Sequence, residues 1–402
     1  MQYKNTKPTV KVEFIILMAL LMSLAALAID TMMPALSIIR KEFDIENINE
    51  GQKIIAYLFL GLSIGQLFHG PLSDSYGRKP VLTFGIILFI LGSLLCIFAP
   101  NFNILLVGRV IQGLGVASTR IITIAIIRDQ YSGREMAKIM SLIMMVFIVI
   151  PAVAPSIGMV ILKFSNWKMI FVLFIILAMS SLIWFILRQV ETLTKEHRKK
   201  LSLANLYRSF VIVATNSISR SYTIISGLIF GAFISYLMTA QQIFQIHYNL
   251  GEHFPLYFGS LAVCIGISSY YNSKLVFRIG MKKLCFAALV VILINSIVFL
   301  AIIEFITPNL SLTVYMIFLV ISFFSIGILF GNLNTLAIEP HGEIAGMATA
   351  IISSIQTFIS IICATFIGNH YINSVTPLII GFGVLSFLSV ILMIYQERDY
   401  LK

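Results

Sequence analysis

Two ionisable residues stand within long apolar stretches of the sequence, Asp30 and Arg109. Inside the hydrocarbon of a membrane a charge costs at least ~2.5–3.5 kcal/mol, so both residues are candidates for function. Burial favours the neutral form of a carboxyl group, which would let Asp30 bind and release protons near neutral pH. The alternative for Asp30 is a carboxylate at a helix end, wetted by interfacial water.

Arg109 begins a polar stripe. Gln112, Gly113, Val116 and Arg120 follow at offsets of three, four, seven and eleven, which places them on one helix face. An unpaired guanidinium there would be costly, so Arg109 requires a carboxylate, helix-end carbonyls or water. We expect Arg109 to interact with Asp30 in one conformation and release it in another. The alternative is a structural polar clamp, which we favour for Arg120.

A short turn between two apolar stretches carries Gly70, Asp74, Gly77, Arg78 and Lys79. Basic residues in short loops also fix the topology of membrane proteins, which alone would explain Arg78 and Lys79. An acid near a helix N-terminus or a basic cluster is favourable at the membrane surface, and we expect Asp74 there. Topology leaves the two glycines and Asp74 unexplained.

A further apolar stretch contains Pro151 and Pro155, four residues apart, and then Gly158. Prolines inside a span remove backbone hydrogen bonds and bend the helix. This pattern indicates a hinge or a seal, and plain packing explains it equally well.

The elements that must position these residues are membrane-spanning helices. Of the 402 residues, 59% are apolar and 11% are charged, with a mean hydropathy of +0.97, whereas soluble domains have ~45–50% and ~25%. This balance excludes a water-soluble enzyme, a disordered chain and a nucleic-acid binder. The net charge of +11 is then explained by cytoplasmic loops. The four cysteines stand singly, without the spacing of a metal site or a disulfide framework.

Twelve apolar segments are each long enough to cross a bilayer core of ~30 Å, which predicts an all-α membrane protein. They lie at 14–39, 54–72, 81–99, 102–127, 139–162, 167–188, 221–246, 254–273, 284–306, 310–338, 344–369 and 375–395. The long polar connection 189–219 divides the chain into two six-helix bundles, 1–188 and 220–402. Most loop Lys and Arg residues fall on one side, so we expect both termini and this central linker in the cytoplasm.

An internal repeat supports the division into halves. The turn 70–80 follows the second segment, and 272–283 follows the eighth; each has a glycine flanked by basic residues, and the second copy lacks a counterpart of Asp74. Repeated six-helix halves are the layout of secondary transporters whose site lies between the halves.

In combination these motifs resemble the major facilitator superfamily, and within it the bicyclomycin-resistance and chloramphenicol-efflux (Bcr/CflA) branch of drug/proton antiporters. The similarity is carried by Gly70-x-Leu72-x-Asp74-x-x-Gly77-Arg78-Lys79, by Arg109-x-x-Gln112-Gly113-x-Gly115, by Asp30-Thr-Met-Met-Pro34-Ala-Leu36, and by Pro151-Ala-Val-Ala-Pro155-Ser-Ile-Gly158. The last of these departs from the antiporter motif twice: the usual first glycine is missing, and Met159 stands where a second final glycine is usual.

The resemblance implies a twelve-helix fold and a role for Arg109 in proton coupling. It also implies that Asp74 closes an inner gate by contacting the second half near 344–346 in the outward-facing state. The expected function is proton-coupled export of small amphipathic compounds such as drugs by a monomer in a bacterial inner membrane. No cofactor, metal or nucleic acid is expected, and the partners are the substrate, protons and the lipid bilayer.

Candidate substrate-lining residues are polar, aromatic or sulfur-bearing and lie at mid-helix positions: Tyr57, Met144, Tyr236, Asn332 and Gln356. For each of them packing is an equally good explanation. The alternatives to drug export are a dedicated metabolite or siderophore exporter and a solute/proton symporter for uptake. A transporter-like sensor or a membrane enzyme is disfavoured, because there is no long soluble domain and the histidines are scattered near helix ends and loops.

Overall fold

The computed structural model describes residues 12–198 and 201–398, and within these ranges every regular element is helical. Residues 1–11 of the first predicted half, 199–200 of the predicted linker and 399–402 of the second predicted half lie outside the described part. Twelve helices in the described part are long and apolar enough to span a membrane, which confirms the predicted all-α fold. The helices that form these spans are α1 (Val12–Asp30), α2 (Leu36–Glu42), α3 (Lys53–Tyr76), α4 (Arg78–Ile97), α5 (Phe102–Gln130), α6 (Gly133–Phe164), α7 (Lys168–Arg188), α9 (Ser217–Gln241), α10 (Phe254–Ile279), α11 (Met281–Phe305), α12 (Leu312–Ile338), α13 (Ala345–Asn369) and α14 (Thr376–Gln396).

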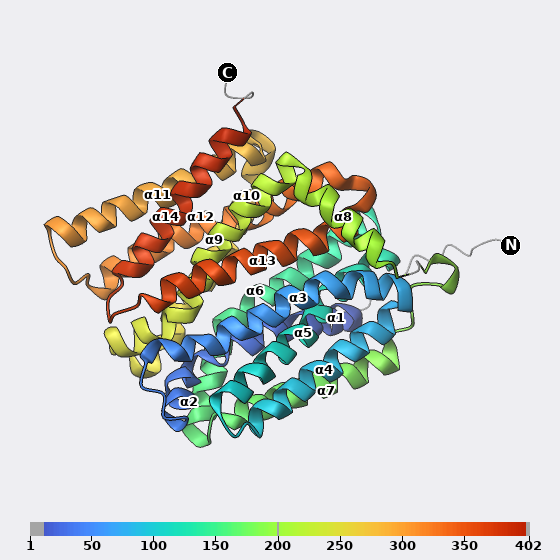
Figure 1. Cartoon of the computed structure of the whole chain (residues 1–402), viewed down its shortest axis with the longest axis horizontal. Coiled ribbons are helices and arrows are strands. Elements are labelled where there is room, and N and C mark those ends of the chain that lie inside the picture. Colours follow the sequence, from blue (N-terminus) through green and yellow to red (C-terminus); the bar gives the residue numbers. More distant parts are fainter. Residues whose placement is uncertain (1–11, 199–200, 399–402) are drawn as a thin grey trace.

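The helices form two bundles that lie side by side. In Figure 1 the blue-to-green bundle, α1–α7, lies below the yellow-green-to-red bundle, α9–α14, and α3 runs beside α13 between them. A second line of contact joins α6 to α10. The connection between the bundles contains a short 3-10 turn, η3 (Lys195–His197), and α8 (Leu203–Thr215), which packs on α9 and α13. We call the end that carries Gly70–Lys79 the inner end, following the predicted orientation, and the opposite end the outer end.

The two halves share a backbone feature at the same place. Gly77, between α3 and α4, has φ +107°, and Gly280, between α10 and α11, has φ +87°. A residue with a Cβ rarely adopts such angles, so each tight turn requires glycine. The repeated glycine of the sequence therefore corresponds to a repeated turn.

The first span is broken, whereas the sequence predicts one segment over 14–39. Helix α1 ends at Asp30, and the chain continues through η1 (Met33–Ala35) into α2. Pro34 lacks the N–H that would bond to the Asp30 carbonyl in a continuous helix, and its ring would clash with that carbonyl. The proline thus places Asp30 at a helix end inside the protein.

Candidate functional site: a buried carboxyl group between two gates

Asp30 is buried, with 4% of its surface exposed. No described residue donates a hydrogen bond to its carboxyl group, although Arg109 bonds to the same helix. Among the described residues the buried hydroxyl groups of Thr31 and Tyr236 also have no hydrogen-bond partner, and Tyr236 lies on α9 of the second half, which contacts η1 directly after α1. The end of α1 is therefore a place where the two halves meet and where polar atoms lack fixed partners.

The helix-five motif packs against this same break. A Cβ on Gly158 would lie 2.2 Å from the Thr31 carbonyl oxygen, so only glycine lets α6 approach the end of α1 so closely. On its other side α6 meets α10, where a Cβ on Gly259 would lie 3.0 Å from the Ala152 carbonyl oxygen. Ala152 lies between Pro151 and Pro155. This placement fits the predicted seal between the halves.

Arg109 is fully buried and has three hydrogen-bond acceptors. Its Nε donates to the Ile54 carbonyl at 2.9 Å, and its terminal nitrogens donate to the Ala28 carbonyl at 2.9 Å and to Gln112 Oε1 at 2.7 Å. Ala28 lies in the last turn of α1, where carbonyls lack helical partners and attract cations. Helix-end carbonyls are thus among its partners, and in this conformation the described residues form no ion pair between Arg109 and Asp30.

The remaining helix-four motif residues extend this network. Gln112 donates to the Ser93 hydroxyl at 2.6 Å, which joins α5 to α4. A Cβ on Gly113 would lie 2.0 Å from the Leu58 carbonyl oxygen, so glycine is required where α5 crosses α3. Arg109, Gln112 and Gly113 therefore hold α1, α3 and α4 together around α5.

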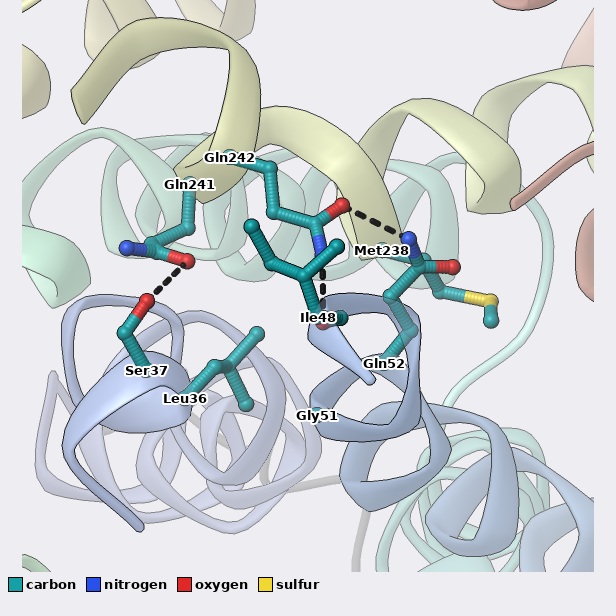
Figure 2. Close-up of a pocket in the computed structure, with 8 residues that line it drawn as sticks. All are labelled: Leu36, Ser37, Ile48, Gly51, Gln52, Met238, Gln241 and Gln242. Carbon is teal, nitrogen blue, oxygen red and sulfur yellow. Dashed lines mark hydrogen bonds between the residues drawn. The ribbon is translucent and has the colours of Figure 1, made fainter. Parts of the chain in front are cut away.

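The outer end of the molecule is closed by amide groups from both halves. Gln52 donates to Gln242 Oε1 at 2.7 Å, Gln242 donates to the Ile48 carbonyl at 2.7 Å, and Ser37 donates to Gln241 Oε1 at 3.0 Å. Figure 2 draws these three hydrogen bonds as dashed lines. Ile48 and Gln52 belong to η2 (Ile48–Gln52), and Gln242 begins a π-helical turn, η4 (Gln242–His247). The pocket among these residues has a volume of about 10 Å³, about the least that holds one water. We call these residues the outer gate.

The loop before α14 completes the outer gate. The Asn49 side-chain amide donates to the carbonyls of Asn369 and Tyr371 at 3.1 and 3.0 Å, and the Tyr371 hydroxyl donates to the Gln242 carbonyl at 3.2 Å. Burial raises the pKa of Tyr371 to about 12. The hydroxyl therefore keeps its proton and its donor role throughout the physiological pH range.

A Gln52→Ala variant is expected to favour opening of the outer gate. It removes two hydrogen bonds between the halves, to Gln242 and to the Gly368 carbonyl, each worth about 0.5–1.5 kcal/mol. The equilibrium should shift about 5- to 150-fold toward the outward-open state. Double electron–electron resonance between spin labels at positions 46 and 372, one in each half at the outer end, would show this shift as a larger population of long distances between the labels.

Lys53→Ala is the matched control, because the one ion pair of Lys53 with a described residue is with Glu50 of its own half. It should leave the distance distribution unchanged. An equal shift in both variants would contradict a gate held by Gln52.

The inner end contains a cavity between the halves. It has a volume of about 210 Å³ and is lined by residues of α3, α5, α12 and α13, among them Gly70, Asp74, Arg78, Gly346 and Met347. Asp74 accepts a hydrogen bond from Arg78 at 2.5 Å and faces a cavity whose far wall includes Gly346. In this conformation, with the outer end closed, Asp74 forms its ion pair with Arg78 of the same half. Closure of an inner gate by Asp74 on 344–346 stays a prediction for the other conformation.

Two acidic residues that sequence reasoning missed hold the turn around Gly77. Arg78 Nε donates to Asp129 at 2.9 Å, and the backbone N–H groups of Arg78 and Lys79 donate to the two oxygens of Glu191 at 2.9 and 3.0 Å. Glu191 thus caps the N-terminus of α4, where a negative charge is favourable. The sequence did contain a signal for these contacts. Asp129 and Glu191 are acids at the predicted inner ends of two apolar segments, the end where Arg78 and Lys79 also lie.

Lys79 has a contact beyond its predicted role in topology. Its Nζ donates to the carbonyls of Ile186 and Gln189 at 2.8 and 2.9 Å, at the C-terminal end of α7. A cation there complements the helix dipole. Together with Glu191 it joins the start of α4 to the start of the central linker.

None of the five predicted substrate-lining residues lines the inner cavity. Asn332 donates to Asn272 at 2.8 Å within the second half, and Tyr236 is packed among the rings of Phe258 and Phe323. Gln356 is buried on α13, whereas Tyr57 and Met144 are partly buried on α3 and α6. Their role in binding substrate stays a prediction.

Arg120 differs from its expected role as a structural clamp. It is exposed and lines the inner cavity, and no described residue accepts a hydrogen bond from its guanidinium. It shares a helix face with Arg109 in the sequence pattern. Only Arg109 lies where neighbouring helices surround that face.

The two six-helix bundles are closed against each other at the outer end and are separated by a cavity at the inner end. This arrangement is typical of membrane carriers built from two bundles. The sequence matches the Major Facilitator Superfamily over residues 18–365, and the chain belongs to this superfamily.

Three comparisons describe what the chain is similar to. It is 25% identical to a bicyclomycin resistance protein homolog of Haemophilus influenzae, over 97% of both chains. It is 27% identical to multidrug resistance protein MdtL of Citrobacter koseri, over 85% of this chain and 86% of the relative. The crystal structure of a D-xylose-proton symporter covers 94% of this chain and 95% of its own with a TM-score of 0.74 at 15% identity, a likeness in fold.

Proposed function

We propose that this transporter exports small amphipathic compounds in exchange for protons. The observation that carries the proposal is the buried carboxyl group of Asp30 at the break in the first span, with no described hydrogen-bond donor. A carboxyl group inside a membrane protein marks a substrate or proton pathway by default, because its insertion is costly. The described histidines form no cluster with other metal-ligating groups that would suggest a different chemistry.

The proposed cycle uses the two gates in turn. In the outer-closed conformation, substrate enters the inner cavity from the cytoplasm while Asp30 is ionised. The halves then rock, the outer gate opens, and a proton from outside binds Asp30 as the substrate leaves. The halves rock back, and Asp30 releases the proton to the cytoplasm. Arg109, fixed to the same helix end at Ala28, would sense this change of charge. One charge crossing ~100 mV gains ~2.3 kcal/mol, enough for ~50-fold accumulation.

The proposed place within the superfamily is the drug/proton antiporter branch that contains bicyclomycin-resistance proteins. Two relatives with drug-resistance names match 97% and 85% of the chain. The proposed location is the inner membrane of a bacterium, with both termini and the central linker in the cytoplasm, and the proposed unit is the monomer. The halves 1–188 and 220–402 would move as the two rigid bodies.

The test is transport by the purified protein in liposomes under an imposed pH gradient, with bicyclomycin and chloramphenicol as probes and a pH-sensitive dye inside. An antiporter should move protons opposite to the probe, and only in its presence. Proton movement in the same direction as the probe would identify a symporter. Transport without any proton movement would overturn the proposed coupling.

A further inference from the structure

The inner cavity contains arginine side chains that the proposed proton coupling does not use. Three arginines line it: Arg78, Arg120 and Arg128. Arg78 is paired with Asp74 and Asp129. Arg120 and Arg128 form no ion pair with any described residue.

Arg120 lies deeper than the other two. It is eight residues before Arg128 on α5, which corresponds to about 12 Å along the helix. A guanidinium at such a depth is costly unless it pairs or faces water, and arginines of this kind mark substrate or ion pathways. Arg109, on the same helix, has three hydrogen-bond acceptors, whereas no described residue accepts a hydrogen bond from Arg120.

The charge of the lining is unbalanced. Among the described lining residues the one acid is Asp74, and it is bonded to Arg78. Asp30 does not line this cavity. A ligand in the cavity therefore meets free positive charge, and an amine would be repelled by it.

The rest of the lining is largely apolar. Its apolar side chains include Ile121, Ile124, Ala125, Ile338, Met347 and Ala350, and its uncharged polar side chains are Gln66, Ser73, Asn334, Thr349 and Ser353. A methionine beside branched side chains suits an apolar body of variable shape. The cavity thus combines apolar side chains with two arginines, Arg120 and Arg128, that form no ion pair with a described residue, and Arg120 is the deeper of the two.

From this arrangement we infer that the substrate carries an anionic group, such as a carboxylate, on an apolar body, and that Arg120 is the residue that binds this group. The inference rests on the proposed transport function and names its substrate class. It also suits the energetics of export, because an inside-negative membrane drives an anion outward as it drives a proton inward.

The experiment measures binding of three fluorescent probes to the full-length protein in nanodiscs of neutral lipid. Dansylglycine carries a carboxylate, dansylglycinamide is its neutral analogue, and N-dansylethylenediamine carries an amine. The wild type should bind dansylglycine about 10-fold more tightly than the amide, since a charged hydrogen bond exceeds a neutral one. The amine should bind most weakly.

Arg120→Gln should lose most of the preference for dansylglycine over its amide, and an unchanged affinity for the amide would show that the cavity is intact. Arg120→Lys should keep most of the preference. Arg278→Gln is the matched control, because it removes an exposed arginine at the inner end of α10 that does not line the cavity. It should leave all three affinities unchanged.

Two results would overturn the inference: tightest binding of the amine by the wild type, or an undiminished carboxylate preference in Arg120→Gln. If the variant does not fold, the relative affinities of the wild type for the three probes still test the inference. Binding is measured without a pH gradient, so a carboxylate preference in a protein that moves no protons would refute the proposed coupling and retain the anionic substrate.

Discussion

An Asp30→Asn variant is expected to lose proton-driven accumulation of substrate, the ~50-fold gradient that one charge supports at ~100 mV, while still exchanging substrate down its gradient. Asparagine has nearly the shape of aspartate but cannot take up the proton. Substrate and a pH-sensitive dye followed together in liposomes would show this separation. A variant that still moves protons with substrate would refute the assignment of Asp30.

Asp44→Asn provides the matched control for this substitution. Asp44 is an exposed acid at the outer end with φ +52°, a conformation that asparagine adopts readily. The Asp44→Asn variant should accumulate substrate to the same level as the wild type. Because Asp30 has no described hydrogen-bond donor, its replacement should not lower the melting temperature, so lost accumulation would not reflect unfolding.

Arg109→Met is expected to destabilise the protein strongly. The substitution leaves the Ala28 and Ile54 carbonyls and Gln112 Oε1 without their guanidinium donors. Each hydrogen bond to a charged group contributes about 1.5–3 kcal/mol, so the loss of three lowers the free energy of unfolding by about 4.5–9 kcal/mol. Thermal unfolding of the purified protein in detergent should begin many degrees lower.

Arg109→Lys should be intermediate, because one ammonium cannot reach three acceptors that the planar guanidinium fork reaches together. Arg278→Met is the control: this exposed arginine has no described acceptor, and its loss should leave the melting temperature unchanged. Equal melting temperatures for Arg109→Met and the wild type would mean that the three contacts contribute little.

The number and place of the spans follow from the sequence because hydropathy is a local property. The same holds for the repeated turn, where Gly77 and Gly280 both have positive φ. The sequence also placed a costly charge at Asp30 and at Arg109. The break of the first span was predictable from Pro34, because proline has no N–H to donate to the Asp30 carbonyl. Hydropathy alone predicts one continuous span there, because the residues on both sides of the break are apolar.

The gates could not be predicted in this way. Gln52 and Gln242 are 190 residues apart, and nothing in the local pattern of either predicts that their amides meet. The same is true of Glu191, which caps the start of α4 from the central linker. Such contacts depend on how whole bundles pack.

Arg109 and Arg120 show this division most clearly. Helical periodicity alone determined that both lie on one face of α5. The tertiary structure decided that the outer part of this face is enclosed by α1, α3 and α4, whereas its inner part borders the cavity between the halves. The burial of a side chain depends on which helices cover it, and that is a property of the assembled bundles.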